Sequence, residues 1–177
     1  MRSVESIVKL DFAFSQFCSQ HKFNRQVARV SKTVSQTGDG PTYLLIGILC
    51  YLKGGEVGKL LLLSGLLAFA IELPIYWIAK NSFRRRRPSE LCQFFTSHIT
   101  PSDRYSLPSG HTAAAFLMMT VISYYYPDLL MFTLIWASLI GLSRILLGVH
   151  FLSDVLIGAL LGFSTGYASI QFVKALV

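Results

Sequence analysis

The sequence predicts an all-α integral-membrane protein, a helical bundle of about five spans preceded by an N-terminal amphipathic helix at the membrane interface. Hydrophobic residues make up 53% of the 177 residues and charged residues 14%, whereas a soluble domain carries roughly a quarter charged residues. The charges are also clustered, since an arginine run at residues 84–87 stands between long uncharged stretches. This length fits one domain, which we assign to residues 1–177.

The formal net charge of +7 limits the possible partners. A duplex-binding face needs basic residues on an extended polar surface, which this apolar chain lacks, so we expect no nucleic-acid partner. The phospholipid bilayer, through its anionic head groups, or an anionic substrate at its surface explains the excess better. Cys18, Cys50 and Cys92 stand at unrelated spacings without a CxxC pair, which predicts neither a metal site nor a disulfide framework.

Residues 1–40 are predicted to form an interfacial amphipathic segment rather than a secretory signal. Apolar residues recur there at helical spacing, at Ile7, Leu10, Phe14 and Phe17. Charged residues between them, such as Asp11, interrupt any signal-peptide core and favour a helix that lies in the interface plane. Residues 23–36 carry further basic side chains and are expected to lie on the same surface.

Residues 42–176 are predicted to form the membrane bundle. Its apolar segments are residues 42–52, 60–79, 111–126, 129–147 and 151–173. Because a helix needs roughly 20 residues to cross a bilayer core about 30 Å thick, the first segment spans fully only if it borrows residues before Gly38. The stripe of Gly158, Gly162 and Gly166, at four-residue spacing, predicts close packing of the last span against a neighbour.

Three clusters of polar residues stand at span ends that the order of the spans places on one side of the membrane. The first cluster holds Lys80 and Arg87, which are seven residues apart, so two helical turns would bring them to one face. Guanidinium groups bind phosphate oxygens bidentately, and lysine binds them as a point charge. The alternative is a basic anchor for anionic lipid beside the membrane.

The second cluster opens the third span with Ser109, Gly110 and His111. Ser109 is a natural N-cap, and Gly110 lets an anion approach the backbone. The free N–H groups of the helix end therefore predict an anion site, which His111 would face. The alternative is an ordinary capped helix whose histidine extends to the interface.

The third cluster lies where the fourth and fifth spans meet and contains Arg144, His150 and Asp154. His150 and Asp154 are four residues apart and would share a helix face, which suits a carboxylate that holds an imidazole in one tautomer and stabilises its cation. Arg144 joins them only if the chain turns near Gly148. The alternative is a buried His–Asp pair with a structural role, since ionisable groups at the edge of apolar spans are costly unless paired or functional.

Together, the patterns Lys-x6-Arg-Pro, Pro-Ser-Gly-His and Ser-Arg-x5-His-x3-Asp resemble the type-2 phosphatidic acid phosphatase superfamily over residues 60–173. The resemblance implies that His150 is the nucleophile and forms a phosphohistidine, that Asp154 orients it, and that His111 protonates the leaving oxygen. It also implies a set of phosphate ligands, namely Lys80, Arg87, Arg144, Ser109 and the Gly110 amide. The family uses no metal for this chemistry, so neither a metal nor another cofactor is expected.

The resemblance further implies an enzyme that dephosphorylates a membrane lipid phosphate or diphosphate, such as polyprenyl diphosphate, phosphatidylglycerophosphate or phosphatidate. The arginine run is similar to that of the polyisoprenoid diphosphate phosphatase branch, and Arg84, Arg85 and Arg86 would be available for a second phosphate. One alternative is a lipid phosphotransferase that uses the same phosphohistidine. Another is a non-enzymatic lipid-binding membrane protein, which would be expected to carry decayed motifs.

Two further features concern the membrane. Glu72 stands in mid-span just before Pro74, and an intramembrane carboxylate is either functional or paired across the bundle. Basic residues are more numerous on the side of the motifs, at Arg2, Lys9, Lys22, Arg25, Arg29 and Lys32, than on the other side, at Lys53, Lys59 and Lys174. The positive-inside rule then places the site on the cytoplasmic side of what we take to be the bacterial cytoplasmic membrane.

Overall fold

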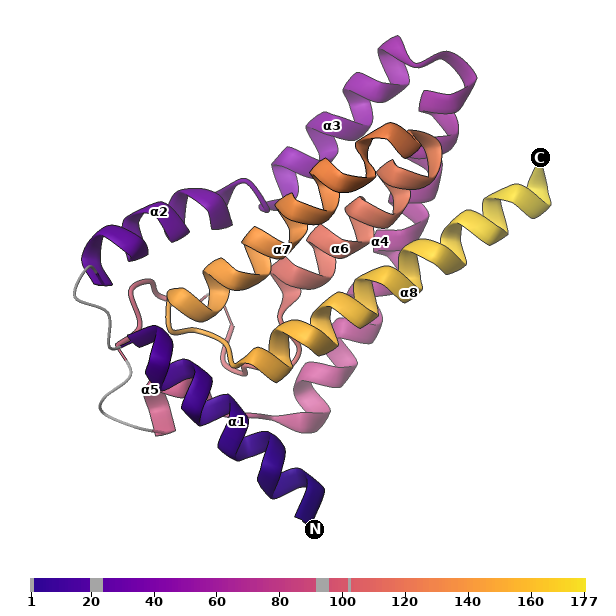
Figure 1. Ribbon diagram of the computed structural model, residues 1–177. Coiled ribbons are helices and arrows are strands. Elements are labelled where there is room, and N and C mark those ends of the chain that lie inside the picture. Colours follow the sequence, from indigo (N-terminus) through magenta and orange to yellow (C-terminus); the bar gives the residue numbers. More distant parts are fainter. Residues whose placement is uncertain (1, 20–23, 92–95, 102) are drawn as a thin grey trace.

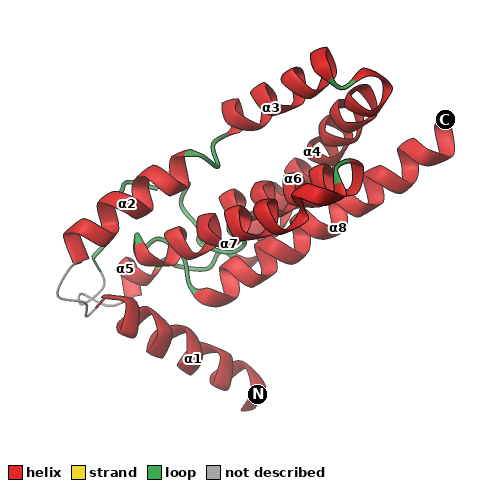
Figure 2. Cartoon of the chain, turned by 45° about the horizontal axis from the view of Figure 1, so that its top comes forward, coloured by secondary structure: helices red, strands yellow, loops and turns green. Residues whose placement is uncertain are grey.

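The computed structural model describes residues 2–19, 24–91, 96–101 and 103–177, and every regular element in these ranges is helical (Figures 1 and 2). The elements are α1 (Arg2–Ser19), α2 (Asn24–Gln36), α3 (Gly40–Lys53), α4 (Gly55–Phe83), α5 (Pro88–Leu91), α6 (Gly110–Tyr125), η1 (Pro127–Leu129), α7 (Leu130–Leu146) and α8 (Leu152–Leu176). The all-α prediction is therefore confirmed over these ranges. The side chains of Arg2, Lys22 and Cys92 lie outside the described residues.

Each predicted apolar segment forms a helix, namely α3, α4, α6, α7 and α8. Within the described ranges, three regions are long and apolar enough to cross a membrane: Gly55–Leu91, Pro127–Leu146 and Leu152–Leu176. Helix α3 is a shorter apolar helix of 14 residues, and α6 has 16. Since helices satisfy their own backbone hydrogen bonds in lipid, the chain is an integral-membrane helical protein. The count of five spans stays a prediction.

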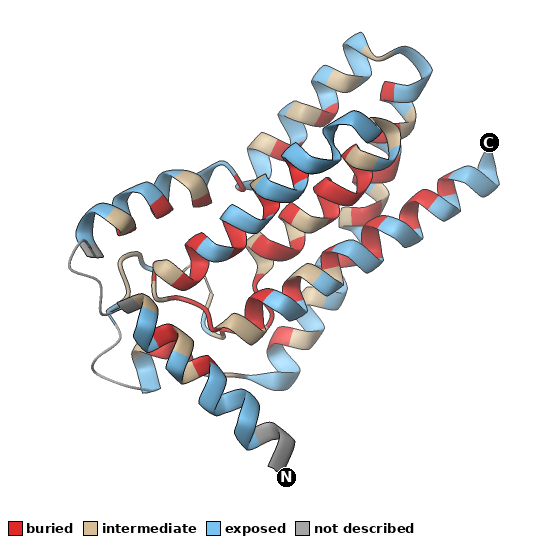
Figure 3. Cartoon of the chain, in the orientation of Figure 1, coloured by how far each residue is buried: buried red, intermediate tan, exposed pale blue. Residues whose placement is uncertain are grey.

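Helix α6 lies at the centre of the bundle, packed against α4, α7 and α8 (Figure 1). Most of its residues are buried, whereas the outer helices carry more exposed residues (Figure 3). Exposed apolar side chains on these outer helices include Phe132 and Leu160. A helix that is apolar on all sides needs such a central place. Because α6 begins with the second polar cluster, its central position puts that cluster between the helices that carry the other two.

Close contact between α6 and α8 follows from the glycine stripe of α8. A Cβ added at Gly158 would lie 2.5 Å from the backbone oxygen of Ser109, and one at Gly162 would overlap the backbone oxygen of Ala113. The predicted role of these glycines in close helix packing is confirmed. The contact also joins two polar clusters, because the Ser109 amide donates a hydrogen bond to the backbone oxygen of Asp154 (3.0 Å).

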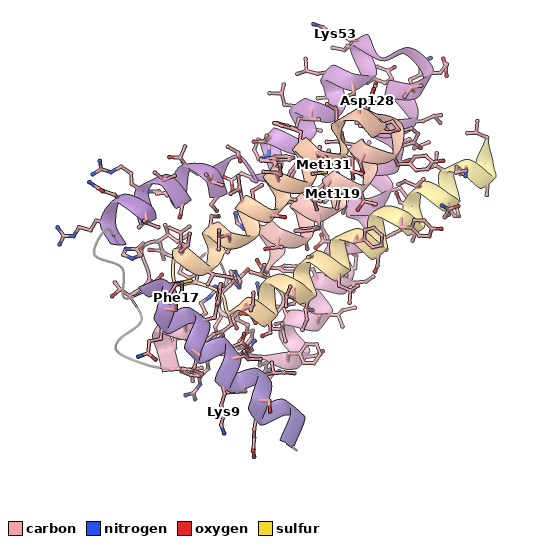
Figure 4. The ribbon with its side chains drawn as sticks, viewed as in Figure 1. Lys9, Phe17, Lys53, Met119, Asp128 and Met131 are labelled. Carbon is pink, nitrogen blue, oxygen red and sulfur yellow. The ribbon has the colours of Figure 1, made fainter. Side chains whose placement is uncertain are left out.

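The helices α1 and α2 lie across the end of the bundle where α7 leads into α8 (Figure 1), α1 against both of them and α2 against α7. Figure 4 places Lys9 and Phe17 of α1 at this end, and Lys53 and Asp128 at the opposite end. Helix α2 exposes its two arginines and Lys32. The interfacial position of these helices stays a prediction.

Replacing Gly162 with Ala is expected to destabilise the bundle, because the new methyl group overlaps a backbone oxygen that cannot move aside as a flexible side chain would. Overpacking of this kind costs about 1–3 kcal/mol. The measurement is the Tm of the purified protein in detergent. Gly65→Ala is the matched control, since its Cβ would meet only the Met118 sulfur, at 3.9 Å. Equal Tm values for the two variants would contradict the contact.

Candidate active site

The three polar clusters meet around a cavity of about 360 Å³ near the junction of α2 and α3. The predicted site residues that line it are Arg87, Gly110, His111, Arg144 and His150. Lys80 and Asp154 stand behind this lining and contact residues that belong to it. Ser109 is joined to Asp154 by the backbone hydrogen bond between α6 and α8. The structure therefore brings all the predicted site residues together.

Lys80 and Arg87 converge, but not through two turns of continuous helix, so that part of the prediction is wrong. Helix α4 ends at Phe83, and Arg84 follows with φ 46°, in the left-handed region. A helix running on to Arg87 is disfavoured because the residue before Pro88 avoids the α conformation. The chain turns instead, and the turn carries Arg87 back towards Lys80.

A carboxylate, Asp103, holds the two cations together. Lys80 Nζ lies 2.7 Å from Asp103 Oδ2, and Arg87 donates a hydrogen bond to Oδ1. The Tyr76 hydroxyl donates to Oδ2 as well (2.6 Å). Burial alone would raise the pKa of Asp103, but these hydrogen bonds and the two positive charges outweigh it and hold the pKa below its ordinary value. Arg87 also donates to the backbone oxygen of Val149 (2.6 Å), which ties this cluster to the turn between α7 and α8.

His111 stands in the first turn of α6. Its Nε2 lies 3.0 Å from Oδ1 of Asp39, which belongs to the break between α2 and α3. Ser109 occupies the predicted N-cap position, but its hydroxyl bonds to Thr112 Oγ1 (2.8 Å) and caps no backbone amide, so the predicted side-chain cap is wrong. Ser109 therefore leaves the first amides of α6 without a side-chain acceptor, and Gly110 at this end lines the cavity.

Arg144, His150 and Asp154 meet because the chain turns between α7 and α8, where Gly148 has φ 72°, as predicted. His150 lies in this turn, ahead of the start of α8 at Leu152, so the prediction that it shares a helix face with Asp154 is wrong. Asp154 stands in the first turn of α8 and its Oδ2 is 3.7 Å from His150 Nδ1. The two side chains therefore face each other across a helix start rather than along a helix, and His150 Nδ1 makes no hydrogen bond with the described residues.

The pKa of His150 is shifted by the surroundings of this side chain, which is 3% exposed. Burial lowers the pKa of His150 to about 4, the charges of Arg144 and Arg87 act in the same direction, and Asp154 opposes them. The imidazole is therefore neutral at neutral pH. Nε of Arg87 and Nε of Arg144 are buried and find no hydrogen-bond acceptor among the described residues. Buried cationic donors of this kind suit an anion.

Glu72, on α4, lines the same cavity and is 2% exposed. Among the residues that the structure describes, no hydrogen-bond partner or opposite charge acts on its carboxylate. Of the two interpretations left open by the sequence, its place in the cavity favours a functional carboxylate over a structural pair across the bundle.

A second, more polar cavity of about 550 Å³ adjoins the first. The two cavities share Asp39, His111 and Arg144. Lys32 lines the second cavity, whereas the first is also lined by apolar side chains such as Phe69. The histidine and arginine at the boundary therefore have a polar approach on one side and an apolar approach on the other.

The sequence analysis missed Asp39 and Asp103, and it assigned Arg85 incorrectly. Arg85 pairs with the carboxylates of Asp11 and Asp154, so it is not available for a second phosphate. The sequence did hold an indication of Asp39 and Asp103. Carboxylates are scarce in this chain, and those on the same side of the membrane as the basic motif residues are the expected partners of buried cations.

The fold and the site define a membrane helical bundle with a buried cationic centre around two histidines, and comparison with known proteins assigns the family. The PAP2 superfamily model matches residues 59–177. The chain therefore belongs to the PAP2 superfamily, which its motifs resemble. Phosphatidylglycerophosphatase B of Bacillus subtilis (strain 168) is 32% identical over 108 residues, which cover 55% of this chain and 50% of that protein. The chain thus spans half the length of this curated relative.

Two solved structures share the fold. The transmembrane PAP2 type phosphatidylglycerolphosphate phosphatase from Bacillus subtilis aligns with a TM-score of 0.75 and 22% identity, over 100% of this chain and 89% of that chain. Aquifex aeolicus LpxE aligns with a TM-score of 0.75 and 27% identity, over 92% of this chain and 95% of that chain. Since the first alignment covers the whole chain, the likeness of fold extends ahead of residue 59.

Replacing Asp103 with Asn is expected to lower stability at neutral pH by about 1–2 kcal/mol, allowing for partial exposure of the carboxylate to solvent. Because the folded pKa of Asp103 is depressed, its contribution is present above its unfolded pKa of about 3.9 and is lost as the pH falls through the folded value. The measurement is Tm from pH 7 down to about pH 3, over which the difference between wild type and variant should narrow. Glu56→Gln is the control, because it breaks an exposed pair with Lys59. A gap that stayed constant with pH would contradict the assignment.

Proposed function

We propose that this protein dephosphorylates a membrane lipid phosphate, without a metal, through a phosphohistidine on His150. One observation carries the proposal: a buried neutral histidine shares a cavity of about 360 Å³ with two guanidinium groups whose Nε atoms have no acceptor in the described part of the chain. Phosphoryl transfer requires positioning and charge neutralisation above all. Arg87 and Arg144 would provide both for the phosphate oxygens.

In the first step a ring nitrogen of His150 attacks phosphorus, and the bond from phosphorus to the lipid oxygen breaks. The His111 imidazolium gives its proton to that oxygen, and a general acid of this kind contributes about 10²–10⁴ in rate. In the second step water attacks the phosphohistidine and loses a proton to His111, which releases inorganic phosphate and restores His150. Asp154 orients His150 and stabilises the positive charge of its ring.

Lys80, Ser109 and the Gly110 amide complete the proposed phosphate site. The amides at the start of α6 favour an anion, because they point outwards at the positive end of the helix dipole. Lys80 is held by Asp103, so we infer that a phosphate oxygen takes the place of one carboxylate oxygen when substrate binds. The substrate would then meet cations that an internal anion already holds in position.

The two approaches to the site support hydrolysis of a lipid. An apolar cavity of about 240 Å³ between α3 and α4 shares Gly40, Tyr43 and Phe69 with the site cavity, and it would accept part of a hydrocarbon chain. The polar cavity on the other side of His111 would admit water and release phosphate. The reacting phosphate would sit where the two approaches meet.

Phosphatidylglycerophosphate is our first candidate substrate, ahead of polyprenyl diphosphate and phosphatidate. The name of the Bacillus subtilis relative supports this order. The pairing of Arg85 with two carboxylates also removes one reason to expect a diphosphate. Two alternatives are a lipid phosphotransferase and a lipid-binding protein without activity. The experiment below distinguishes both from a phosphatase.

We place the protein in the bacterial cytoplasmic membrane, with residues 1–40 at the interface, residues 42–176 as the bundle and the site on the cytoplasmic side. The exposed apolar side chains of α1 and the exposed basic side chains of α2 support an interfacial position. Both helices lie at the end of the bundle that carries the site, so they add positive charge to that side.

The test is release of inorganic phosphate by the purified protein from phosphatidylglycerophosphate, polyprenyl diphosphate and phosphatidate in mixed micelles, with and without excess EDTA. We expect release with water as acceptor and no loss in EDTA, since cations surround the proposed site and no group of three metal-binding side chains occurs in the described ranges. Transfer of labelled phosphate to a second lipid would indicate a phosphotransferase instead. No release from any of the three would contradict the proposal.

His150→Ala is expected to abolish turnover and His111→Ala to lower it by about 10²–10⁴, since one removes the nucleophile and the other the general acid. Acid quenching of wild type with ³²P-labelled substrate should trap an acid-labile phosphoprotein that His150→Ala lacks. Both variants should keep the wild-type Tm within a few degrees. Rapid phosphate release by His150→Ala would remove His150 as the nucleophile.

Vanadate is expected to inhibit competitively, because a five-coordinate oxyanion resembles the in-line transition state. Arg87→Ala and Arg144→Ala should each weaken this inhibition roughly ten- to a hundred-fold, the loss of about 1.5–3 kcal/mol for a charged hydrogen bond. Arg84→Ala is the matched control, because Arg84 is exposed and bonds to the backbone of Asn81. Inhibition constants equal to wild type in both site variants would contradict phosphate binding by Arg87 and Arg144. They would instead favour the alternative of a basic anchor for anionic lipid.

A further inference from the structure

Helix α1 contacts the bundle through a buried polar residue as well as through an aromatic pair, Phe12 with Phe151 (ring centroids 5.5 Å apart). Asp11 is 2% exposed, whereas Leu10 and Phe17 are 65% and 68% exposed. A helix that only covered a hydrophobic surface would bury its apolar side chains instead. Burial of a carboxylate is costly unless it is paired and hydrogen-bonded, so the partners of Asp11 indicate what holds α1 in place.

Asp11 lies against Arg85 and the start of α8. Its Oδ2 lies 2.7 Å from Nη2 of Arg85, and its Oδ1 accepts a hydrogen bond from the Ser153 amide (2.9 Å). Nη1 of the same guanidinium lies 2.7 Å from Oδ1 of Asp154 and donates to the Ser153 hydroxyl (2.6 Å). The guanidinium also lies over the Phe151 ring, 4.4 Å from its centroid. Arg85 is therefore fixed between two buried carboxylates.

Both oxygens of Asp154 are engaged. Oδ1 accepts from Arg85, and Oδ2 accepts from the Phe151 amide (2.8 Å) while it faces His150 Nδ1 at 3.7 Å. The side chains thus form a series in which a carboxylate, a guanidinium and a second carboxylate lead to the histidine: Asp11, Arg85, Asp154 and His150. The orientation of the carboxylate beside the histidine depends on Arg85 as well as on α8 itself.

We propose that Arg85 and Asp11 are positioning residues for the nucleophile: Arg85 orients the Asp154 carboxylate and offsets part of its charge, and Asp11 holds Arg85. The proposal rests on the proposed function of His150. It makes α1 a part of the active site, although none of the α1 side chains that the structure describes lines the site cavity. It also gives Arg85 a role apart from the phosphate-binding role of Arg87.

The charge pattern predicts opposite effects for the two residues. Without Arg85, the full charge of Asp154 stabilises the imidazolium, so the pKa of His150 should rise. Without Asp11, the charge of Arg85 acts on Asp154 alone, so the pKa of His150 should fall. The other ionisable side chains around His150, Asp154 and the cavity are unchanged in both variants: Arg87, Arg144, His111, Asp103, Asp39, Glu72, Tyr43, Tyr76 and Lys80.

The experiment compares Arg85→Gln and Asp11→Asn in the full-length protein, with Arg86→Gln as the matched control. Arg86 belongs to the same arginine run and is exposed, so its loss removes the same charge without breaking the series. We expect the acid limb of the kcat profile to move up by about one pH unit in Arg85→Gln and down in Asp11→Asn. We also expect kcat to fall roughly ten-fold in Arg85→Gln with little change in KM, since a supporting partner of the catalytic pair is lost.

A second readout does not depend on turnover. The histidine ring signals of ¹⁵N-labelled protein report the titration of His150 directly, with the His150→Ala spectrum as the assignment. Arg85→Lys keeps the charge but not the fork that reaches three side chains, so it should keep the wild-type titration with a partly reduced kcat. If Arg85→Gln does not fold, Asp11→Asn/Arg85→Gln removes the unpaired carboxylate and should still show a raised pKa of His150.

Shifts of the same sign in both single variants, or a His150 titration equal to wild type in both, would overturn the proposal and leave α1 with a purely structural role. A wild-type protein that releases no phosphate would refute the proposed function. In that case the opposite shifts in the His150 titration would still establish the Asp11–Arg85–Asp154 coupling.

Discussion

The backbone contact between α6 and α8 determines where the two histidines stand. The Ser109 amide bonds to the backbone oxygen of Asp154, and Gly158 leaves no space for a side chain beside Ser109. His111 and His150 stand just beyond this contact, one on each chain segment. Because protein cores are close-packed and barely compressible, the distance between the proposed general acid and the proposed nucleophile is set by how closely these two helices approach. Under the proposed mechanism, small residues in α8 therefore serve the reaction as well as the packing.

Burial of cations in an apolar bundle imposes the second constraint. Lys80 and Arg87 share the carboxylate of Asp103, which lowers the cost of removing them from water. Arg144 differs, because among the described residues its guanidinium donates to the neutral hydroxyl of Ser35 (2.7 Å) and forms no ion pair with a carboxylate. It is the least compensated of the three cations. In the proposed phosphate site, the binding free energy should therefore depend on Arg144 more than on the cations that already have an internal anion.

Much of the fold was predictable from the sequence, because hydropathy and helix-breaking residues act locally. All the predicted apolar segments form helices, and the turn at Gly148 occurs where it was expected. The three clusters were predictable for the same reason, together with the order of the spans. Predictions made from residue spacing along a helix were wrong where a helix begins or ends inside a motif. Arg87 lies beyond the end of α4, and His150 lies ahead of α8, so arguments from helical periodicity do not apply to either. Contacts to Asp39 and Asp103 depend on loops whose positions only the tertiary packing decides.

The segment ahead of the family match supplies partners that the motifs lack. The PAP2 model begins at residue 59, yet three site residues find their partners before it: Asp11 for Arg85, Ser35 for Arg144 and Asp39 for His111. Each of these partners lies on or beside α1 or α2, which pack against the junction of α7 and α8. Ionisable groups are costly in an apolar setting without such partners. Under the proposed mechanism the motifs supply the reacting groups, and the N-terminal helices help to determine the charge and orientation of those groups. Substitutions outside the motifs, at Asp11, Ser35 or Asp39, should then alter the site as well.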